Sequence, residues 1–214
     1  FKVDSHGRRS HTCGELRADH VGSTVVLKGW VDSRRDLGGL IFVDLRDRYG
    51  LTQLVFNPQH DAAAHAKADH LRSEFVIAAR GGVEARPEGM VNEKLATGAI
   101  EVNCNDLRIL NTSPTPPFLI EDSIDTGEEI RLRHRYLDLR RTRMQHNLML
   151  RHKAYQATRS FLDGHQFIEV ETPFLTKSTP EGARDYLVPS RVHPGQFFAL
   201  PQSPQTYKQL LMVS

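Results

Sequence analysis

The segment PQSPQTYKQLLM, residues 201–212, brings a hydroxyl, an amide and an ammonium group close together in the sequence. Ser203 followed by Pro204 is typical of a helix start, because serine caps free N–H groups and proline at the first helical position loses no hydrogen bond. Gln205 and Lys208 then lie on one face of the first turn. The helix macrodipole favours anions at this end, so the lysine is either solvated or faces an anionic partner. The segment alone leaves both interpretations open.

Histidines and cysteines offer no comparable pattern. Among the eleven histidines, His60, His65 and His70 are the most regularly spaced. A period of five residues turns each side chain by about 140° around a helix, so the three do not converge on a metal ion. Cys13 and Cys104 lack metal-ligand spacing and are expected to be buried thiols in a reducing compartment. The sequence therefore predicts no metal site.

Composition indicates a globular chain with a real core. Of its 214 residues 39% are hydrophobic, and 28 basic and 26 acidic residues give a net charge of +2, so any nucleic-acid surface must be local. No apolar run approaches the roughly 18 residues of a membrane-spanning helix. The opening FKVDSHGRRSHT has no apolar signal-peptide region. We expect a cytoplasmic protein without a membrane partner, with an organellar matrix as the alternative location.

Short β-rich segments occupy the first half of the chain, well before residues 201–212. We predict strands and one helix in the order strand, strand, strand, helix, strand, strand, at residues 24–36, 39–47, 51–56, 61–72, 74–86 and 98–110. Gly38-Gly39 and Tyr49-Gly50 supply turns between the first three strands. This order is that of an OB-fold barrel, which binds single-stranded nucleic acid on its second and third strands.

Four residues of this barrel suit a nucleic-acid ligand. Arg34 and Arg35 suit phosphates or a base edge, Phe42 suits stacking on a base, and Gln53 suits a hydrogen bond to one. Each has a structural alternative. Phe42 alternates with aliphatic neighbours, a pattern that favours the core, and the two arginines could be solvated.

The remainder of the chain predicts a linker and the start of a second domain. Residues 111–129 are proline-rich and residues 130–143 are dense in arginine, which suits either an RNA backbone or solvent. Residues 144–163 predict a helix that ends at Gly164, and residues 167–176 predict a strand interrupted at Pro173. We therefore expect domains at residues 1–112 and 143–214, with a hinge at residues 113–142.

Several segments resemble a known family. FLDGHQFIEVETPFL (161–175) resembles motif 1 of class II aminoacyl-tRNA synthetases. TKSTPEGARDYLVPSR (176–191) and PQSPQTYKQLLM (201–212) are similar to aspartyl-tRNA synthetases of the bacterial type, as are GWVDSRRDLGGLIFVDLRD and YLDLRR. The resemblance implies an α+β chain: an amino-terminal five-stranded OB-fold β-barrel, followed by the start of a class II antiparallel α/β catalytic domain.

The resemblance also implies roles for residues of both parts. In the barrel, Phe42 would stack on an anticodon base, Gln53 would hydrogen-bond beside it, Glu101 would accept from a cytosine amino group, and Arg34 and Arg35 would contact the anticodon. In the second part, Pro173 would lie near a homodimer interface. The implied aspartate site consists of Glu181 facing the substrate ammonium group, Ser203 and Gln205 seating the amino acid, and Lys208 pairing with its side-chain carboxylate.

The implied activity is ATP-dependent activation of L-aspartate, with Mg²⁺, and transfer of the aspartyl group to tRNA(Asp). The resemblance places the arginines that hold ATP beyond residue 214, so we expect no catalytic residue in this stretch and no activity from it alone. Leu37 favours strict tRNA specificity over charging of both aspartate and asparagine tRNAs. The alternatives are a non-catalytic OB-fold RNA-binding module and a catalytically dead synthetase relative.

Overall fold

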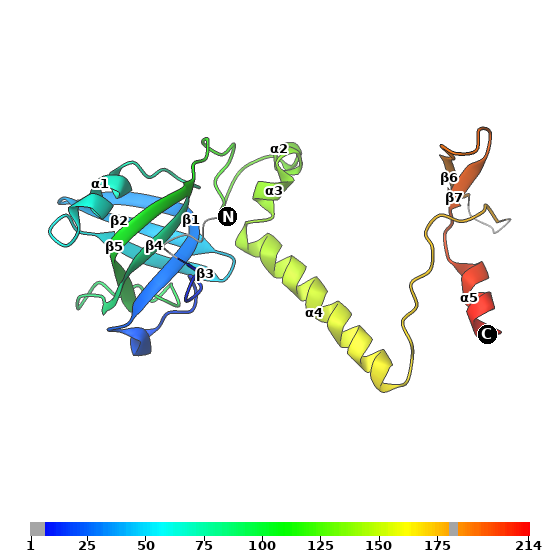
Figure 1. Ribbon diagram of the computed structural model, residues 1–214, viewed down its shortest axis with the longest axis horizontal. Coiled ribbons are helices and arrows are strands. Elements are labelled where there is room, and N and C mark those ends of the chain that lie inside the picture. Colours follow the sequence, from blue (N-terminus) through cyan, green and yellow to red (C-terminus); the bar gives the residue numbers. More distant parts are fainter. Residues whose placement is uncertain (1–6, 180–183) are drawn as a thin grey trace. The chain divides into compact units, whose positions relative to one another are not determined.

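A closed barrel of five strands is the main feature of the computed structural model, which describes residues 7–179 and 184–214 (Figure 1). Its order is β1-β2-β3-β5-β4. Neighbouring strands are antiparallel except β3 and β5, which run parallel and pair at Leu54 with Val102 and at Val55 with Asn103. The strands are β1 (Thr24–Leu37), β2 (Leu40–Asp47), β3 (Gly50–Phe56), β4 (Val76–Ala85) and β5 (Ile100–Asn111).

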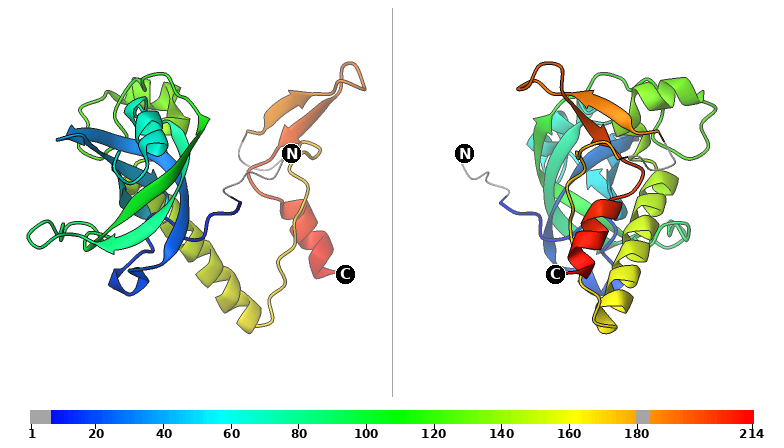
Figure 2. Two further views of the ribbon diagram at one scale, coloured as in Figure 1. Left: turned by 60° about the vertical axis from the view of Figure 1, so that its left-hand side comes forward. Right: turned by 90° about the vertical axis from the view of Figure 1, so that its right-hand side faces the viewer.

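The strands form because side chains of alternate residues enter one core. In β2 the buried and half-buried positions alternate strictly, with Ile41, Val43 and Leu45 inside. Gly38 and Gly39 make the tight turn before β2 with φ of +63° and +84°, values that favour glycine. Two views of the barrel are given in Figure 2. The predicted strand order, the predicted helix and the two buried, unpaired thiols are all confirmed.

Two short helices accompany the barrel. The 3-10 helix η1 (Ala18–His20) precedes β1, and α1 (Ala62–Asp69) lies between β3 and β4 in sequence. Asp61 begins α1 by accepting a 2.7 Å hydrogen bond from the backbone N–H of Ala64. Ala64 and Ala68 then pack into the barrel core, which makes α1 part of the same hydrophobic unit.

A connecting segment, residues 112–141, follows the barrel and contains α2 (Glu128–Arg133) and α3 (Arg135–Asp138). Its centre is Asp138, which is fully buried and accepts hydrogen bonds from Arg135 at 2.5 Å and Arg141 at 2.9 Å. Arg141 also donates to the backbone carbonyls of Glu121 and Asp122. A buried carboxylate requires such partners, and here they fold the segment onto itself.

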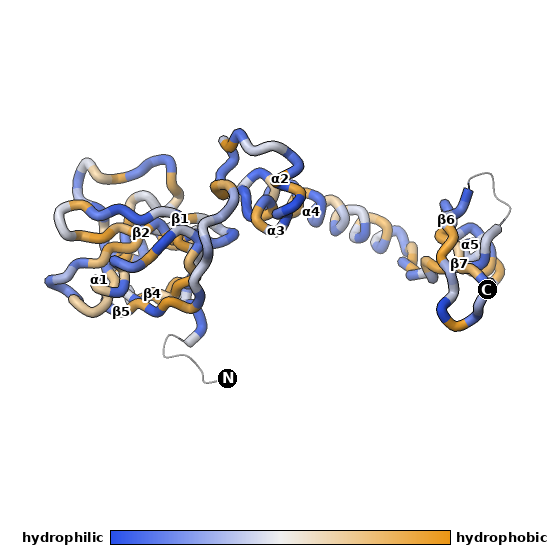
Figure 3. The backbone as a smooth tube through the Cα atoms, turned by 90° about the horizontal axis from the view of Figure 1, so that it is seen from above, coloured by the Kyte–Doolittle hydropathy of each residue, from blue (hydrophilic) through white to orange (hydrophobic). Residues whose placement is uncertain are grey.

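The chain divides into two compact units, Phe1–Met149 and Leu150–Ser214, and the division falls inside α4 (Thr142–Gly164). In the second unit β6 (Tyr186–Pro189) and β7 (Phe197–Leu200) form a hairpin, with α5 (Gln205–Met212) after it. Figure 3 shows hydrophobic residues along this hairpin, and several of them are exposed. The expected domain limits at 112 and 142 stay predictions.

Two expectations about the second unit are wrong. Residues 167–175 form no strand, because a strand needs a ladder partner and the described residues supply only a single bridge, between Thr176 and Ala199. Ser203 does not cap α5: Pro204 is the N-cap residue, and the Ser203 hydroxyl instead accepts a hydrogen bond from Lys208. Within the described residues, no helix is both long enough and apolar enough to span a membrane.

Candidate functional site

A cluster of polar side chains connects four barrel strands on the outer face. Gln53 on β3 donates to Glu101 on β5 at 2.9 Å. The side-chain amide oxygen of Gln53 accepts from Arg35 on β1 at 3.4 Å. Arg35 also donates to Asp44 on β2 at 3.0 Å. We call Arg35, Asp44, Gln53 and Glu101 the barrel cluster. It places acceptors and donors side by side on the strands that the OB-fold uses for nucleic acid.

Phe42 belongs to the same region. It pairs in register with Arg35 on one side and with Val55 on the other, and it lies two residues before Asp44 on the same face of β2. Its side chain is half-buried and lies outside the hydrophobic core that takes in both of its neighbours, Ile41 and Val43. The core interpretation of Phe42 is therefore wrong, and its ring is available at the edge of the barrel cluster.

Glu101 has an altered acidity because of its surroundings. Partial burial raises the pKa of its carboxyl group above the ordinary value. The hydrogen bond from Gln53 and the charge of Arg86 lower this pKa, whereas the charge of Glu84 raises it further. Gln53 occupies Oε2 of Glu101, so the carboxylate keeps a second oxygen with which to accept from a ligand.

Arg34 does not join this cluster. Its Nε donates to the carbonyl of Ala68 at 3.1 Å, and Nη2 forms an ion pair with Asp69. Both partners lie at the carboxyl end of α1, where a cation suits the helix macrodipole. These contacts use donors that the predicted anticodon contact would require.

Asp44 is the member of the barrel cluster that sequence reasoning missed. It accepts from Ser33 at 2.6 Å as well as from Arg35, so it orients the arginine beside Gln53. The period-two alternation of β2 carried the signal, since Asp44 shares a face with Phe42. Its partner on β1 depends on the register, which shifts at a bulge between Val31 and Ser33 and cannot be read from the pattern.

The second unit contains a pocket of about 320 Å³ between Thr176–Thr179 and the start of α5. Ser203 and Gln205 line it, together with Tyr207 and Leu210. Lys208 is not among the lining residues, but its ammonium nitrogen lies 3.4 Å from the Ser203 hydroxyl oxygen. Within residues 7–179 and 184–214, Lys208 has no carboxylate partner. Glu181 lies outside the described residues.

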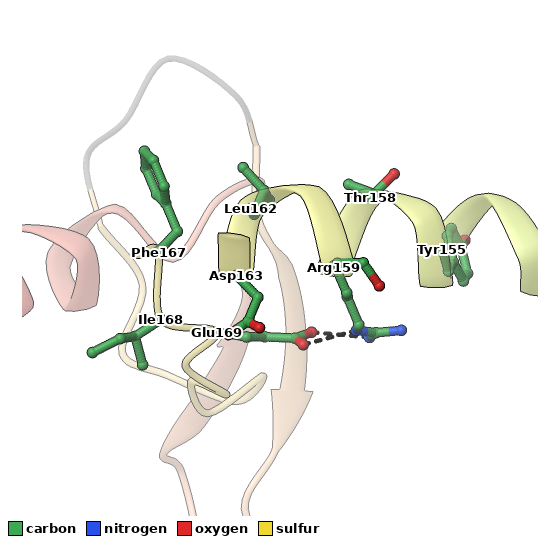
Figure 4. A pocket seen from close by; sticks show the side chains of 9 residues that line it. Tyr155, Thr158, Arg159, Leu162, Asp163, Phe167, Ile168 and Glu169 are labelled. Atoms are coloured by element: carbon green, nitrogen blue, oxygen red, sulfur yellow. Dashed lines mark hydrogen bonds and ion pairs between the residues drawn. The ribbon is translucent and has the colours of Figure 1, made fainter. Parts of the chain in front are cut away.

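A larger cavity of about 590 Å³ lies where α4 ends (Figure 4). Tyr155, Leu162, Phe167 and Ile168 contribute apolar surface to it. At the edge of this cavity Arg159 donates to both carboxylate oxygens of Glu169, at 2.7 and 2.9 Å. This bidentate pair lowers the pKa of Glu169. Pro173 follows as an exposed residue.

Two family models match the chain in succession. Residues 25–110 match the OB-fold nucleic acid binding domain, and residues 127–214 match the class II tRNA synthetases (D, K and N). The first range contains the barrel cluster and the second contains the pocket at α5.

Curated relatives and solved structures agree with this assignment. The chain is 63% identical to an aspartate-tRNA(Asp/Asn) ligase of Salinibacter ruber and 62% identical to one of Desulfosudis oleivorans, over 98% and 99% of its length. It covers 34% and 36% of those proteins, so it spans about a third of their length.

Among solved structures, the asparaginyl-tRNA synthetase of Pyrococcus horikoshii with asparaginyl-adenylate has a TM-score of 0.79 at 24% identity, over 95% of this chain and 45% of that one. The aspartyl-tRNA synthetase of Entamoeba histolytica has a TM-score of 0.73 at 19% identity, over 94% and 42%. These two likenesses concern the fold. The family models and the curated relatives together show that the chain belongs to the class II aminoacyl-tRNA synthetases, with aspartate-type enzymes among its relatives.

Proposed function

We propose that this chain is part of an aspartate-tRNA ligase that activates L-aspartate with ATP and transfers it to tRNA. The barrel, with residues up to 112, would bind the anticodon, residues 113–142 would act as a hinge, and residues 143–214 would begin the catalytic domain. The curated relatives are named for both aspartate and asparagine tRNAs, so we extend the proposal to both, against the indication of Leu37.

The observation that carries the proposal is the barrel cluster with Phe42 beside it. A half-buried ring offers a stacking surface, and Glu101 offers to a base amino group the carboxylate oxygen that Gln53 does not use. Arg35 supplies a cation beside them, although Asp44 already neutralises part of its charge. Three different contacts, from β1, β2 and β5 of one barrel, suit one unstacked base and its neighbours better than a uniform phosphate chain.

The pocket at α5 supports the aspartate half of the proposal. Ser203 and Gln205 offer hydrogen-bonding groups, and Lys208 stands next to Ser203 in the first turn of the helix. The substrate's side-chain carboxylate would displace the Lys208–Ser203 contact and pair with the ammonium group. Glu181 would complete the site by facing the substrate's own ammonium group.

ATP, Mg²⁺ and a second subunit complete the proposed enzyme. ATP would supply the adenylyl group and Mg²⁺ would neutralise its phosphates. Because no metal-binding cluster of His, Cys, Asp or Glu occurs in the described part of the chain, we assign no residue here to Mg²⁺. We propose a homodimer in which Pro173 lies near the interface, and a cytoplasmic or organellar enzyme.

Two measurements test the proposal separately. The chain should bind an RNA hairpin carrying an aspartate anticodon, with an affinity that falls steeply with salt. The parent protein should charge tRNA with aspartate, whereas the 214-residue chain should give no aspartate-dependent pyrophosphate exchange. Hairpin binding by a parent that shows neither exchange nor charging would instead establish an RNA-binding module or an inactive relative.

A further inference from the structure

Glu74 occupies an unusual position just before β4. Its φ of +63° lies in the left-handed region, which residues other than glycine rarely adopt. Its backbone is fixed to β1, because its N–H donates to the carbonyl of Val31 at 2.7 Å and the Val31 N–H donates to the carbonyl of Phe75 at 2.9 Å. Such a strained conformation persists only where neighbouring contacts hold it in place, so the contacts of the Glu74 side chain are expected to matter.

The Glu74 carboxylate is 5% exposed and holds two arginines from different parts of the chain. One oxygen accepts from Arg46 on β2, and the other accepts from Arg140 in the connecting segment at 3.1 Å. Arg46 has a second partner in Asp32, at 2.9 Å. Removing one side of a buried ion pair leaves the other charge uncompensated, so these contacts constrain where Arg140 lies.

Arg140 also contacts an aromatic ring of the barrel. Its guanidinium carbon lies 4.6 Å from the centre of the Trp30 ring, a cation–π geometry. Trp30 pairs in register with Arg46, so the ring and the β2 partner of Glu74 belong to one patch of the barrel, and Arg140 of the connecting segment contacts this patch. A small cavity of about 220 Å³ at this junction is lined by Trp30, Glu74, Arg140 and the prolines of the connecting segment.

This patch continues the face that carries the barrel cluster. Phe42, Asp44 and Arg46 follow one another at alternate positions of β2 and therefore share a side of the sheet. An RNA base held at Phe42 would thus lie on the same surface against which Arg140 is fixed. The connecting segment ends at Arg141 and passes directly into α4, so the orientation of Arg140 is also the orientation of the helix start.

We infer that Glu74, Trp30 and Arg140 form a positioning contact that fixes the anticodon-binding barrel relative to the first turns of α4. This inference rests on the proposed function. A tRNA bound by its anticodon must present its distant end to a second site, so a small change of angle at the barrel becomes a large displacement there. The positioning contact would limit that angle without touching RNA or amino acid.

A distance measurement on the 214-residue chain tests the geometric part. Spin labels at Arg80→Cys on β4 and His146→Cys on α4 occupy exposed positions, and both native cysteines are buried. Pulsed electron resonance should give a narrow distance distribution that broadens at least twofold in Arg140→Met. Arg133→Met, which removes an exposed arginine paired with Glu129, should leave it unchanged. An unchanged distribution in Arg140→Met would overturn the inference.

Kinetics of the parent enzyme test the functional part. Arg140→Met should leave aspartate-dependent pyrophosphate exchange and hairpin affinity unaltered but lower kcat/KM for tRNA charging about tenfold or more, because misplacement of a reacting group is costly. Arg140→Lys should restore part of the rate. Broadened distances with normal charging would also overturn the positioning role. If Arg140→Met broadens the distances but the wild-type parent protein neither binds the hairpin nor charges tRNA, the proposed function is refuted and the geometric part of the inference stands.

Discussion

Replacing Glu101 by glutamine should change which base the barrel accepts. Oε2 of Glu101 already accepts from the Gln53 amide at 2.9 Å, and the Gln53 carbonyl oxygen is held by Arg35, so the Gln53 NH₂ group must face position 101. A carboxylate meets this donor with one oxygen and a cytosine amino group with the other. An amide has one oxygen and one NH₂ group. In Glu101→Gln the new NH₂ group would therefore face another donor, either the Gln53 NH₂ group or the base amino group.

The expected loss follows from this count of acceptors. Losing a charge-assisted hydrogen bond to a base costs about 1 to 3 kcal/mol, or roughly 5- to 150-fold in affinity. The glutamine NH₂ group would instead suit the O4 acceptor of uracil, so a hairpin with uracil in place of the contacted cytosine should gain relative to the original. Fluorescence anisotropy with the two hairpins measures both effects. Glu84→Gln, opposite Glu101 across the β4–β5 ladder, makes the same charge change and is the control.

Acidity provides an independent check on the same residue. Only the ionised carboxylate accepts with both oxygens at once, one from the Gln53 amide and one from the base amino group, and partial burial raises the pKa of Glu101. Hairpin affinity should therefore fall on acidification at a pH above the range of an ordinary glutamate, and Glu101→Gln should remove this dependence.

The stability of the fold should depend on pH in the opposite direction to hairpin affinity: acidification weakens binding but favours the folded state. A raised pKa means that the folded state disfavours the charged form, so stability from this group is present at low pH and is lost as the pH rises through the folded pKa. At neutral pH, Glu101→Gln should leave the Tm unchanged or slightly higher. Wild-type affinity and an intact preference for cytosine in Glu101→Gln would refute this account of the barrel cluster.

Three further predictions concern other residues. In the full-length enzyme, Lys208→Met should lower kcat/KM for aspartate about 30-fold to several thousand-fold, since loss of one partner of a desolvated charge pair costs roughly 2 to 5 kcal/mol; unchanged aspartate kinetics would exclude the pairing. Phe42→Ala should weaken hairpin binding by about 1 to 3 kcal/mol of stacking, and a melting curve shows whether the folded fraction also falls. Cys13 and Cys104 should react with a thiol reagent only on unfolding, because burial raises both thiol pKa values; rapid reaction of the folded chain would contradict this.

The barrel was predictable because its signals are local. The period-two alternation around Phe42 and the Gly38-Gly39 turn specify β1 and β2 almost to the residue. Asp44 was not predictable as a member of the barrel cluster, because its role depends on which β1 residues it faces. A bulge in β1 sets the β1–β2 register, and the pattern does not reveal the bulge. Pattern placed Phe42 in the core, whereas its place on the outer face makes it a candidate contact.

The second unit was less predictable because its signals require distant partners. Residues 167–175 have the composition of a strand, but alternation cannot supply the neighbouring backbone that a ladder requires. At α5 the Ser-Pro pair suggested a serine cap. The backbone turns at Pro204, and the hydroxyl of Ser203 accepts from Lys208 instead. The Ser203 hydroxyl can either cap the helix or accept from Lys208, and the sequence alone does not show which of the two contacts forms.

The parallel junction of β3 and β5 has a consequence for local opening of the barrel. The two strands pair at Leu54 with Val102 and at Val55 with Asn103, fewer positions than at the other strand junctions of the barrel. Because fewer backbone pairs hold this junction, we expect it to open locally before the longer ladders of the barrel. Gln53 and Glu101 stand one residue before these pairs, on opposite sides of the junction. A base bound by both would hold it closed, so RNA would slow amide hydrogen exchange there more than in β1 or β4.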